Sequence, residues 1–168
     1  PTLSMKIVTN NKLSYSLTDN AGDCIGNLQY ETEDFAAATL QVHQQFYVKN
    51  DRPGTWTFYN QSELKAVSRM KVVTGGKIRL ESGSLRHEFR KTSHWYFRFV
   101  LYNKEGEELL AIKPVTNWDL QAYEFLLQIN DDLSAECNSF LILQAIHCAI
   151  CSMGMMYDKT VPPIVSIF

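Results

Sequence analysis

Apolar and polar residues alternate in a long series of short segments that covers most of the chain, as they do in β-strands buried on one face. Gly, Asn, Asp or Pro stands between most of these segments and marks turns. Many short strands at this spacing predict an all-β sandwich or barrel. The predicted strands are Met5–Val8, Leu13–Thr18, Cys24–Tyr30, Thr39–Val48, Thr55–Tyr59, Glu63–Val73, Lys77–Glu81, Leu85–Arg90, Trp95–Tyr102, Glu107–Val115 and Leu120–Ile129.

The alternation also predicts how neighbouring strands pair. Around Gly75, a three-residue loop places Met70 opposite Leu80 and Val72 opposite Ile78, which keeps the apolar residues on one face. A glycine at positive φ is expected in this loop. Around the next turn with a clear pattern, a four-residue loop at Asn103–Gly106 pairs Phe99 with Leu110 and Phe97 with Ile112.

A long apolar stretch follows the strands. Phe140–Tyr157 reads FLILQAIHCAICSMGMMY and contains no Asp, Glu, Lys or Arg. With Ser134 as N-cap, the pattern predicts a helix from about Ala135 to Met156, and Ile164–Phe168 is expected to form one last strand. A helix that is apolar all round must be enclosed by lipid or by protein.

Enclosure by protein is the favoured alternative, and a membrane anchor is the other. Gln144 and His147 lie in the middle of the stretch, where each polar group would need a partner in lipid. The flanking charges show no positive-inside pattern. A barrel of about twelve strands has room for one helix along its axis. The fold expected is therefore an all-β barrel, residues 1–168 as one domain, with a central hydrophobic helix.

Composition fits a folded domain in a reducing compartment. The 168 residues include 45% hydrophobic and 20% charged residues, and the net charge is −2. Three of the four cysteines lie in or next to the apolar stretch, which is a poor disulfide framework, and the N-terminus lacks the pattern of a signal peptide. These features predict a cytoplasmic location. The cysteines are Cys24, Cys137, Cys148 and Cys151.

Several of these features together resemble the tubby C-terminal-like superfamily, which includes the plant LURP-one-related proteins and the phospholipid scramblases. The matching parts are the Tyr15-x-Leu17-x-Asp19-x-x-Gly22 hairpin followed by Ile25-Gly26, the Trp95–Tyr102 strand with its Asn103–Gly106 turn, and the Ser134–Tyr157 helix. The resemblance implies a barrel threaded by the helix. It also implies contact with membrane lipids, because tubby domains bind phosphoinositides, although no residues of that site align here.

The two turn segments in this resemblance also resemble each other. Tyr15–Gly22 and Phe99–Gly106 share the same order of residue types, 84 positions apart. Either two hairpins use the same turn chemistry, or the barrel arose by duplication.

A basic segment is the best candidate for binding. Residues 65–91 hold eight Lys and Arg against Glu81 and Glu88, a local balance of +6 in a chain of net charge −2. The predicted register aligns four of these cations on one outward face, and two more extend it if the next strand pairs alongside. Such a face could hold phosphate groups by charge-assisted hydrogen bonds; a merely solvated face is the alternative. The candidate ligand-binding residues are Lys65, Arg69, Lys71, Arg79, Arg86 and Arg90.

Other candidate chemistry is weaker. Cys148 and Cys151, preceded by His147, have a spacing known from redox and metal sites, but their apolar setting predicts small core residues and a hydrogen-bonded core histidine. No metal site, cofactor or catalytic residue is predicted, and no phosphate-binding loop or hydrolase motif occurs. The basic segment lacks stacking aromatics, which argues against nucleic acid.

The sequence therefore predicts a non-enzymatic binding module for anionic lipid head groups or another phosphate-bearing ligand, with peripheral contact to a membrane surface. Two alternatives stay open. One is a protein-interaction domain whose contact patch would use exposed aromatics such as Trp56, Tyr59 or Trp118. The other is an enzyme with a pocket at one end of the barrel.

Overall fold

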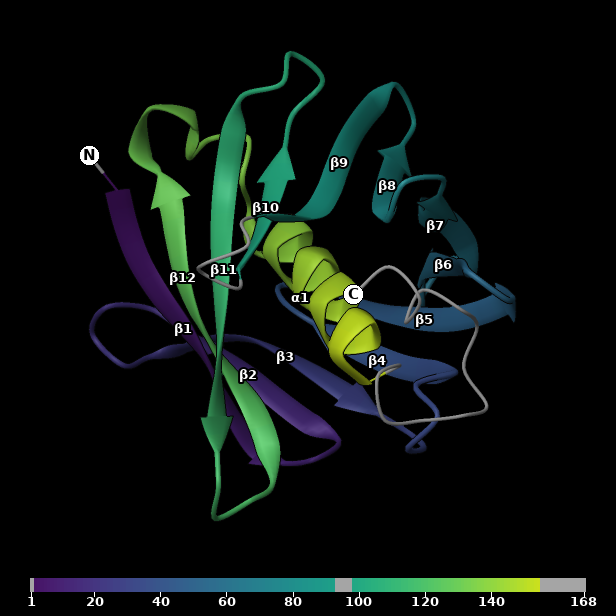
Figure 1. Ribbon diagram of the computed structural model, residues 1–168. Helices are drawn as coiled ribbons and strands as arrows, with labels where there is room; N and C mark the ends of the chain where they lie inside the picture. Colours follow the sequence, from purple (N-terminus) through teal and green to yellow (C-terminus); the bar gives the residue numbers. More distant parts are fainter. Residues whose placement is uncertain (1, 93–97, 155–168) are drawn as a thin grey trace.

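Twelve antiparallel strands form a closed barrel around one helix (Figure 1). The computed structural model describes residues 2–92 and 98–154. Each strand pairs with its neighbours in sequence, and β1 pairs with β12 to close the ring. The strands are β1 (Thr2–Asn11), β2 (Ser14–Thr18), β3 (Cys24–Tyr30), β4 (Ala37–Gln41), β5 (Gln45–Arg52), β6 (Thr55–Asn60), β7 (Lys65–Val73), β8 (Lys77–Ser82), β9 (Leu85–Thr92), β10 (Arg98–Tyr102), β11 (Glu108–Asn117) and β12 (Ala122–Asn130).

The helix α1 (Ser139–Gly154) fills the interior of the barrel. Every residue from Leu141 to Met153 is buried, with at most 7% of its surface exposed. At 1.5 Å per residue, sixteen residues span about 24 Å, which suits the height of such a barrel. The all-β barrel with a C-terminal hydrophobic helix is thus confirmed, and the helix is enclosed by protein. Among the described residues, no helix has both the length and the apolar character to cross a membrane.

The start of the helix differs from the prediction. Ser134 does not cap α1; its N–H donates to Asp131 O (3.3 Å) and ends a short 3-10 turn, η1 (Asp131–Leu133). Asn138 caps the helix instead, because its Oδ1 accepts from Leu141 N at 2.9 Å. The end predicted for this helix at Met156 and the strand predicted at Ile164–Phe168 lie outside the described residues.

The barrel wall comes closest to the helix at β3. A Cβ atom at Gly26 would lie 2.8 Å from Leu143 Cδ1 and 3.2 Å from Gln41 O. Any larger residue would force the helix and the strand apart, so glycine here permits close packing.

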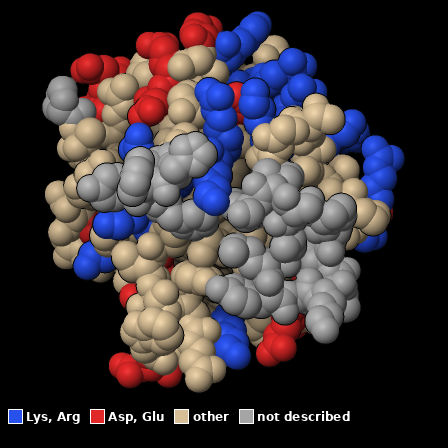
Figure 2. Space-filling view, in the orientation of Figure 1, with Lys and Arg blue, Asp and Glu red and all other residues tan. Residues whose placement is uncertain are grey.

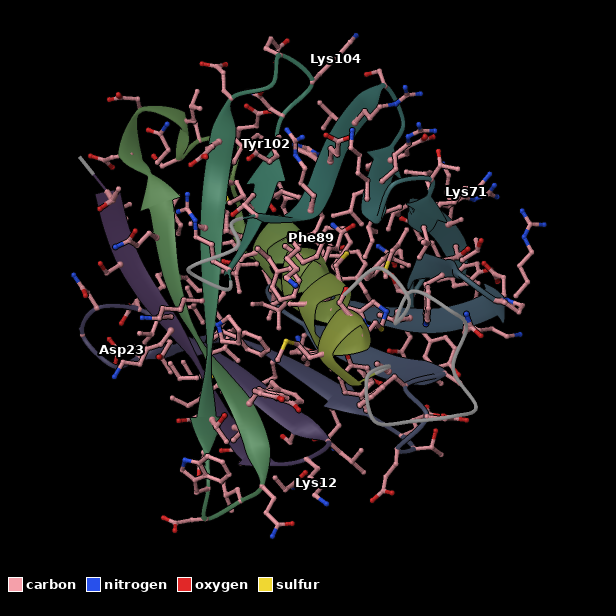
Figure 3. All side chains as sticks on the ribbon, viewed as in Figure 1. Lys12, Asp23, Lys71, Phe89, Tyr102 and Lys104 are labelled. Atoms are coloured by element: carbon pink, nitrogen blue, oxygen red, sulfur yellow. The ribbon has the colours of Figure 1, made fainter. Side chains whose placement is uncertain are left out.

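The hairpin between β7 and β8 has the predicted register. Met70 lies opposite Leu80 and Val72 opposite Ile78, and Gly75 and Gly76 have φ of 82° and 78°. The three-residue loop is confirmed. The inward residues of these strands pack on α1, and the alternate residues face outward; Figure 3 shows Phe89 pointing toward α1 and Lys71 extending away from the barrel.

Two other strand predictions were wrong in detail. The segment predicted as one strand, Thr39–Val48, is two strands, β4 and β5, that reverse direction through residues 42–44. Phe99 pairs with Ile112 rather than with Leu110, because the loop is one residue longer than predicted, with Tyr102 opposite Glu108, and a bulge between Leu101 and Tyr102 adds another residue. The shift is two residues, so the same side chains still face the core; Phe97 lies outside the described residues.

The two similar turn segments fold alike. In one, Gly22 N donates to Asp19 O at 3.0 Å; in the other, Gly106 N donates to Asn103 O at the same distance. Both glycines have positive φ, 87° and 81°. They follow β2 and β10, whereas duplication of half the barrel would relate strands six apart. Shared turn chemistry accounts for the likeness.

Candidate functional site

The thiols of the central helix are core residues, as predicted. Cys148 and Cys151 are 0% and 1% exposed, and Cys137 is also buried. Burial raises the pKa of the Cys148 and Cys151 thiols far above the usual value and that of Cys137 to about 12. These groups stay protonated and shielded from solvent, so they are poor nucleophiles and poor metal ligands.

His147 is a satisfied core histidine. Its Nδ1 lies 2.7 Å from the Tyr30 hydroxyl, and the rings of Tyr30, Trp56 and Phe58 surround it at centroid distances of 5.6–5.8 Å. The tautomer with the proton on Nε2 lets Tyr30 donate to Nδ1. Burial lowers the pKa of His147 to about 3, which keeps the ring neutral. Within the described residues, no three His, Cys, Asp or Glu side chains are grouped to hold a metal ion.

The three aromatics predicted for a contact patch do not all lie at the surface. Trp56 is only 3% exposed, and its Nε1 donates to Phe35 O at 3.3 Å, so it belongs to the core. The prediction for Trp56 was wrong because the β6 alternation places it inward, opposite Met70. Trp118, in the β11–β12 hairpin, is 82% exposed and stands apart from it.

Five of the six predicted cations, together with Lys77, form one surface on the outside of β7, β8 and β9, which we call the basic wall. It consists of Arg69, Lys71, Lys77, Arg79, Arg86 and Arg90. The strand register creates it: Lys71 lies opposite Arg79, and Arg86 lies opposite Glu81, which itself faces Arg69. Figure 2 shows Lys and Arg gathered at the upper right, where Figure 1 places β7 to β9.

Lys65 is not part of this row. A register shift in the β6–β7 pair places Ala66 opposite Tyr59 and Lys65 opposite Asn60. Because a shift of one residue moves a side chain to the other face of a strand, Lys65 does not continue the line of Arg69 and Lys71. It lies exposed at the beginning of β7.

Two glutamates hold the cations of the basic wall loosely. Glu81 Oε1 lies 3.7 Å from Arg79 and 3.6 Å from Arg86. Glu88 lies 3.6 Å from both Lys77 and Arg90. All four distances exceed the 2.7–2.9 Å typical of charge-assisted hydrogen bonds. The guanidinium groups are thus attracted to the carboxylates without being engaged by them in close hydrogen bonds.

A concave site adjoins the basic wall where β8, β9 and β10 meet the turn after β10. We call it the β8–β10 groove. It has a volume of about 500 Å³, within the usual range for small-molecule sites. Figure 3 shows Lys104 on the turn beyond Tyr102. The groove is lined by Val73, Arg79, Ser84, Arg86, His87, Glu88, Tyr102, Asn103, Lys104 and Gly106.

The lining charge of the groove is positive. Arg79, Arg86 and Lys104 bring three cations, and Glu88 is the one carboxylate, which gives a balance of +2 with neutral histidine. On the side of β10, the Arg90 guanidinium lies 4.1 Å from the centre of the Tyr102 ring. This cation–π contact holds both side chains against the wall of the groove.

A buried polar cluster connects the groove to the segment that precedes α1. His87 Nε2 lies 3.4 Å from Glu136 Oε1, and Asn103 Nδ2 lies 3.5 Å from Glu136 Oε2. Asn103 also donates to Glu107 at 3.0 Å. His87 and Asn103 are each 5% exposed. Burial lowers the pKa of His87, and the nearby Glu136 carboxylate opposes that shift.

The sequence predicted only part of this site. Arg79 and Arg86 line the groove, Arg90 borders it through Tyr102, and Arg69 and Lys71 lie on the wall beyond it. Sequence reasoning missed Tyr102, Lys104 and His87 as site residues. The sequence contained one usable signal, Lys104 in the turn that follows β10. Only the pairing of β9 with β10 places this lysine beside Arg86.

Comparison with known proteins adds a likeness of fold. No family model and no curated protein matches the chain. A protein from Arabidopsis thaliana of known X-ray structure is similar with a TM-score of 0.50, at 13% sequence identity, over 86% of this chain and 91% of its own. At that identity the likeness concerns the fold alone.

Proposed function

We propose that this protein is a non-enzymatic binding module for a phosphate-bearing anion, which it holds in the β8–β10 groove beside the basic wall. The observation that carries the proposal is the convergence of Arg79, Arg86 and Lys104 on one concave site. Arg79 lies on β8, Arg86 on β9 and Lys104 in the turn between β10 and β11, so folding brings the three side chains together. The resemblance to tubby-like domains supports the same class of ligand.

The chemistry of the groove fits phosphate oxygens. A guanidinium group offers a planar fork of donors that matches a phosphate edge to edge. The nearest carboxylate oxygens lie 3.6–3.7 Å from the two groove arginines, too far to saturate those donors. A phosphate could therefore bind Arg79 and Arg86 without first breaking a close ion pair.

The basic wall adds attraction at longer range. Its outward cations lie on a convex face of the barrel, where each cation near an anionic lipid surface contributes about 1 kcal/mol. Arg69 and Lys71 carry no ion pair within the described residues, so their charge is uncompensated at close range. We propose lipid head groups as the source of the phosphate, and peripheral contact of the barrel with a membrane surface in the cytoplasm.

Vesicle co-sedimentation tests this function. The full chain should bind vesicles containing an anionic phospholipid and leave neutral phosphatidylcholine vesicles unbound, and added salt should weaken the binding. Arg79→Glu combined with Arg86→Glu should lower the affinity for anionic vesicles by about tenfold or more. The matched control is Lys6→Glu with Lys113→Glu, two exposed lysines that flank Leu126 on β1, β11 and β12.

Equal binding to neutral and anionic vesicles would overturn the proposal, as would an equal loss in the groove variant and the control. A protein-interaction role is the second candidate, because Trp118 is 82% exposed beside an apolar hollow lined by Ala122 and Tyr123. Loss of binding on Trp118→Ala, with no effect of the charge reversals, would favour a contact through that hairpin.

A further inference from the structure

His87 lies between two cavities, and the proposed function gives it no role. It lines the β8–β10 groove on one side and, on the other, a smaller cavity of about 80 Å³ beside the first turns of α1. It is 95% buried, since only 5% of its surface is exposed. A histidine in this position forms the floor between the outer site and the interior of the barrel.

The Nε2 atom of His87 has no hydrogen-bond partner among the described residues. The approach of Glu136 Oε1 at 3.4 Å lies within ion-pair range, but it lacks the alignment of a hydrogen bond. Buried side-chain nitrogen atoms are nearly always hydrogen-bonded, and each exception calls for an explanation. A ligand in the groove would bring the missing acceptor once the imidazole ring turns this N–H away from Glu136, which lines the smaller cavity.

We propose that the β8–β10 groove selects a phosphomonoester group and that His87 donates a hydrogen bond to it from the floor. This inference rests on the proposed function and narrows its ligand. A phosphomonoester carries close to two negative charges and three terminal oxygens, whereas a phosphodiester carries one charge and two such oxygens. Three cations and an unpaired donor match the first group better.

Glu88, the one carboxylate in the groove, does not oppose this assignment. Lys77 and Arg90 lie on either side of it at 3.6 Å and compensate its charge. Glu88 therefore does not cancel the charge of Arg79, Arg86 and Lys104, which can bind the ligand. The phosphomonoester could belong to a lipid head group or to a free phosphate, and the chemistry of recognition is the same.

The proposed contact makes binding depend on pH. A proton on His87 adds a positive charge at the floor of the groove, and Glu136 lies close enough to stabilise it. Because burial lowers the pKa of His87 below the ordinary value of 6.5, binding should tighten only at a pH lower than that at which free histidine becomes charged. The charged and titratable groups around His87 in its two cavities are Arg79, Glu81, Arg86, Glu88, Tyr102, Lys104 and Glu136.

Vesicles of two compositions test the ligand class. Phosphatidic acid presents a phosphomonoester and phosphatidylglycerol presents a phosphodiester; both are mixed into phosphatidylcholine at matched surface charge. The full chain should prefer phosphatidic acid by about tenfold, the effect expected of one hydrogen bond to a charged group. Titration calorimetry with inorganic phosphate is a second measurement. Binding of inorganic phosphate would show that a free phosphate is a sufficient ligand, and binding only to the vesicles would show that the ligand is a lipid head group.

Three variants test the role of His87. His87→Leu removes the donor and should abolish the preference for phosphatidic acid. His87→Gln keeps an N–H donor that cannot be protonated, so it should preserve the preference near neutral pH and lose the tightening on acidification. His43→Gln, at an exposed histidine in the β4–β5 turn, is the control and should behave as the unmodified protein. Comparison at each pH cancels the titration of the phosphate itself.

Failure of this inference and failure of the proposed function give different results. Equal binding of both anionic lipids, with His87→Leu unchanged, overturns the phosphomonoester assignment and leaves anion binding intact. The same pH profile for the unmodified protein and His87→Gln also overturns the role of His87. Absence of binding to either anionic lipid overturns both. Thermal unfolding of each variant confirms that the compared proteins are folded.

Discussion

Two histidines among the described residues are almost fully buried, yet their surroundings differ. His147 lies in the middle of α1, accepts a hydrogen bond from Tyr30 and is enclosed by aromatic rings. His87 lies on β9 at the floor of the β8–β10 groove, with Nε2 unpaired and Glu136 nearby. Burial disfavours the charged form of both rings and lowers the pKa of both.

This difference indicates a structural role for His147, whereas His87 can respond to a ligand or to pH. His147 has its partner within the protein and is fully buried, so protonation would disrupt the packing around it. His87 has an unused donor, a carboxylate that opposes the effect of burial and a cavity open to ligands. Burial alone is therefore a poor guide to function, and the satisfaction of the polar atoms distinguishes the two cases.

The largest expected contrast comes from replacing each ring by alanine. His147→Ala leaves a cavity among aromatic rings and a tyrosine hydroxyl without its acceptor, so it should lower the free energy of unfolding by about 3 kcal/mol. His87→Ala opens space that already adjoins two cavities, and the loss should be about 1 kcal/mol. Urea unfolding measures both. Equal losses would show that the two sites are packed alike.

A second, smaller effect tests the hydrogen bond alone. Tyr30→Phe removes only the hydroxyl and leaves His147 Nδ1 unsatisfied in the core, which should cost about 1–2 kcal/mol of unfolding free energy. The matched control is Tyr15→Phe, whose hydroxyl donates to Lys12 O at 3.1 Å next to an exposed turn. Water can replace that partner, so the control should lose less than about 1 kcal/mol. Similar losses in the two variants would argue against a special role for the core pair.

The last prediction concerns the pH dependence of stability, which is the smallest effect when it is counted per pH unit. The pKa of His147 is about 3 in the folded protein and 6.5 as its ordinary value, so between these values only the unfolded chain is protonated. Its contribution is complete above pH 6.5 and is lost as the pH falls toward 3, at roughly 1 kcal/mol per pH unit.

His87 acts in the same direction, because its pKa is also lowered, but Glu136 reduces its share. Urea unfolding at neutral pH and at mildly acidic pH gives the slope. His147→Gln should flatten this slope more than His87→Gln does. A steeper dependence on His87 would reverse the assignment of the structural and the responsive histidine.

Much of the fold was predictable because its determinants are local. The Gly75–Gly76 loop, the alternation in β7 and β8, and the apolar stretch of α1 can each be read without knowing the rest of the chain. One error occurred where a local signal was absent. The turn at residues 42–44 has the sequence Val-His-Gln, without Gly, Pro, Asn or Asp, so two strands were predicted as one.

The site was harder to predict because it depends on contacts between separate hairpins. The outward position of Arg79 and Arg86 follows from one hairpin and the strand after it. The arrival of Lys104 and Tyr102 follows from the pairing of β9 with β10, and that of Glu136 from the path of the chain after β12. A lysine in a turn and a glutamate before a helix have many other uses, so their types alone carry little information.

The order of the elements along the chain has a consequence for synthesis in the cell. The ring closes between β1 and β12, and α1 follows all twelve strands. A ribosome therefore releases the whole wall of the barrel before the part that fills its lumen. Until residue 154 has emerged, the inward leucines and phenylalanines of the strands lack their partner and can bind chaperones or other unfinished chains. Among the described residues, the helix is the last component of the core to be made.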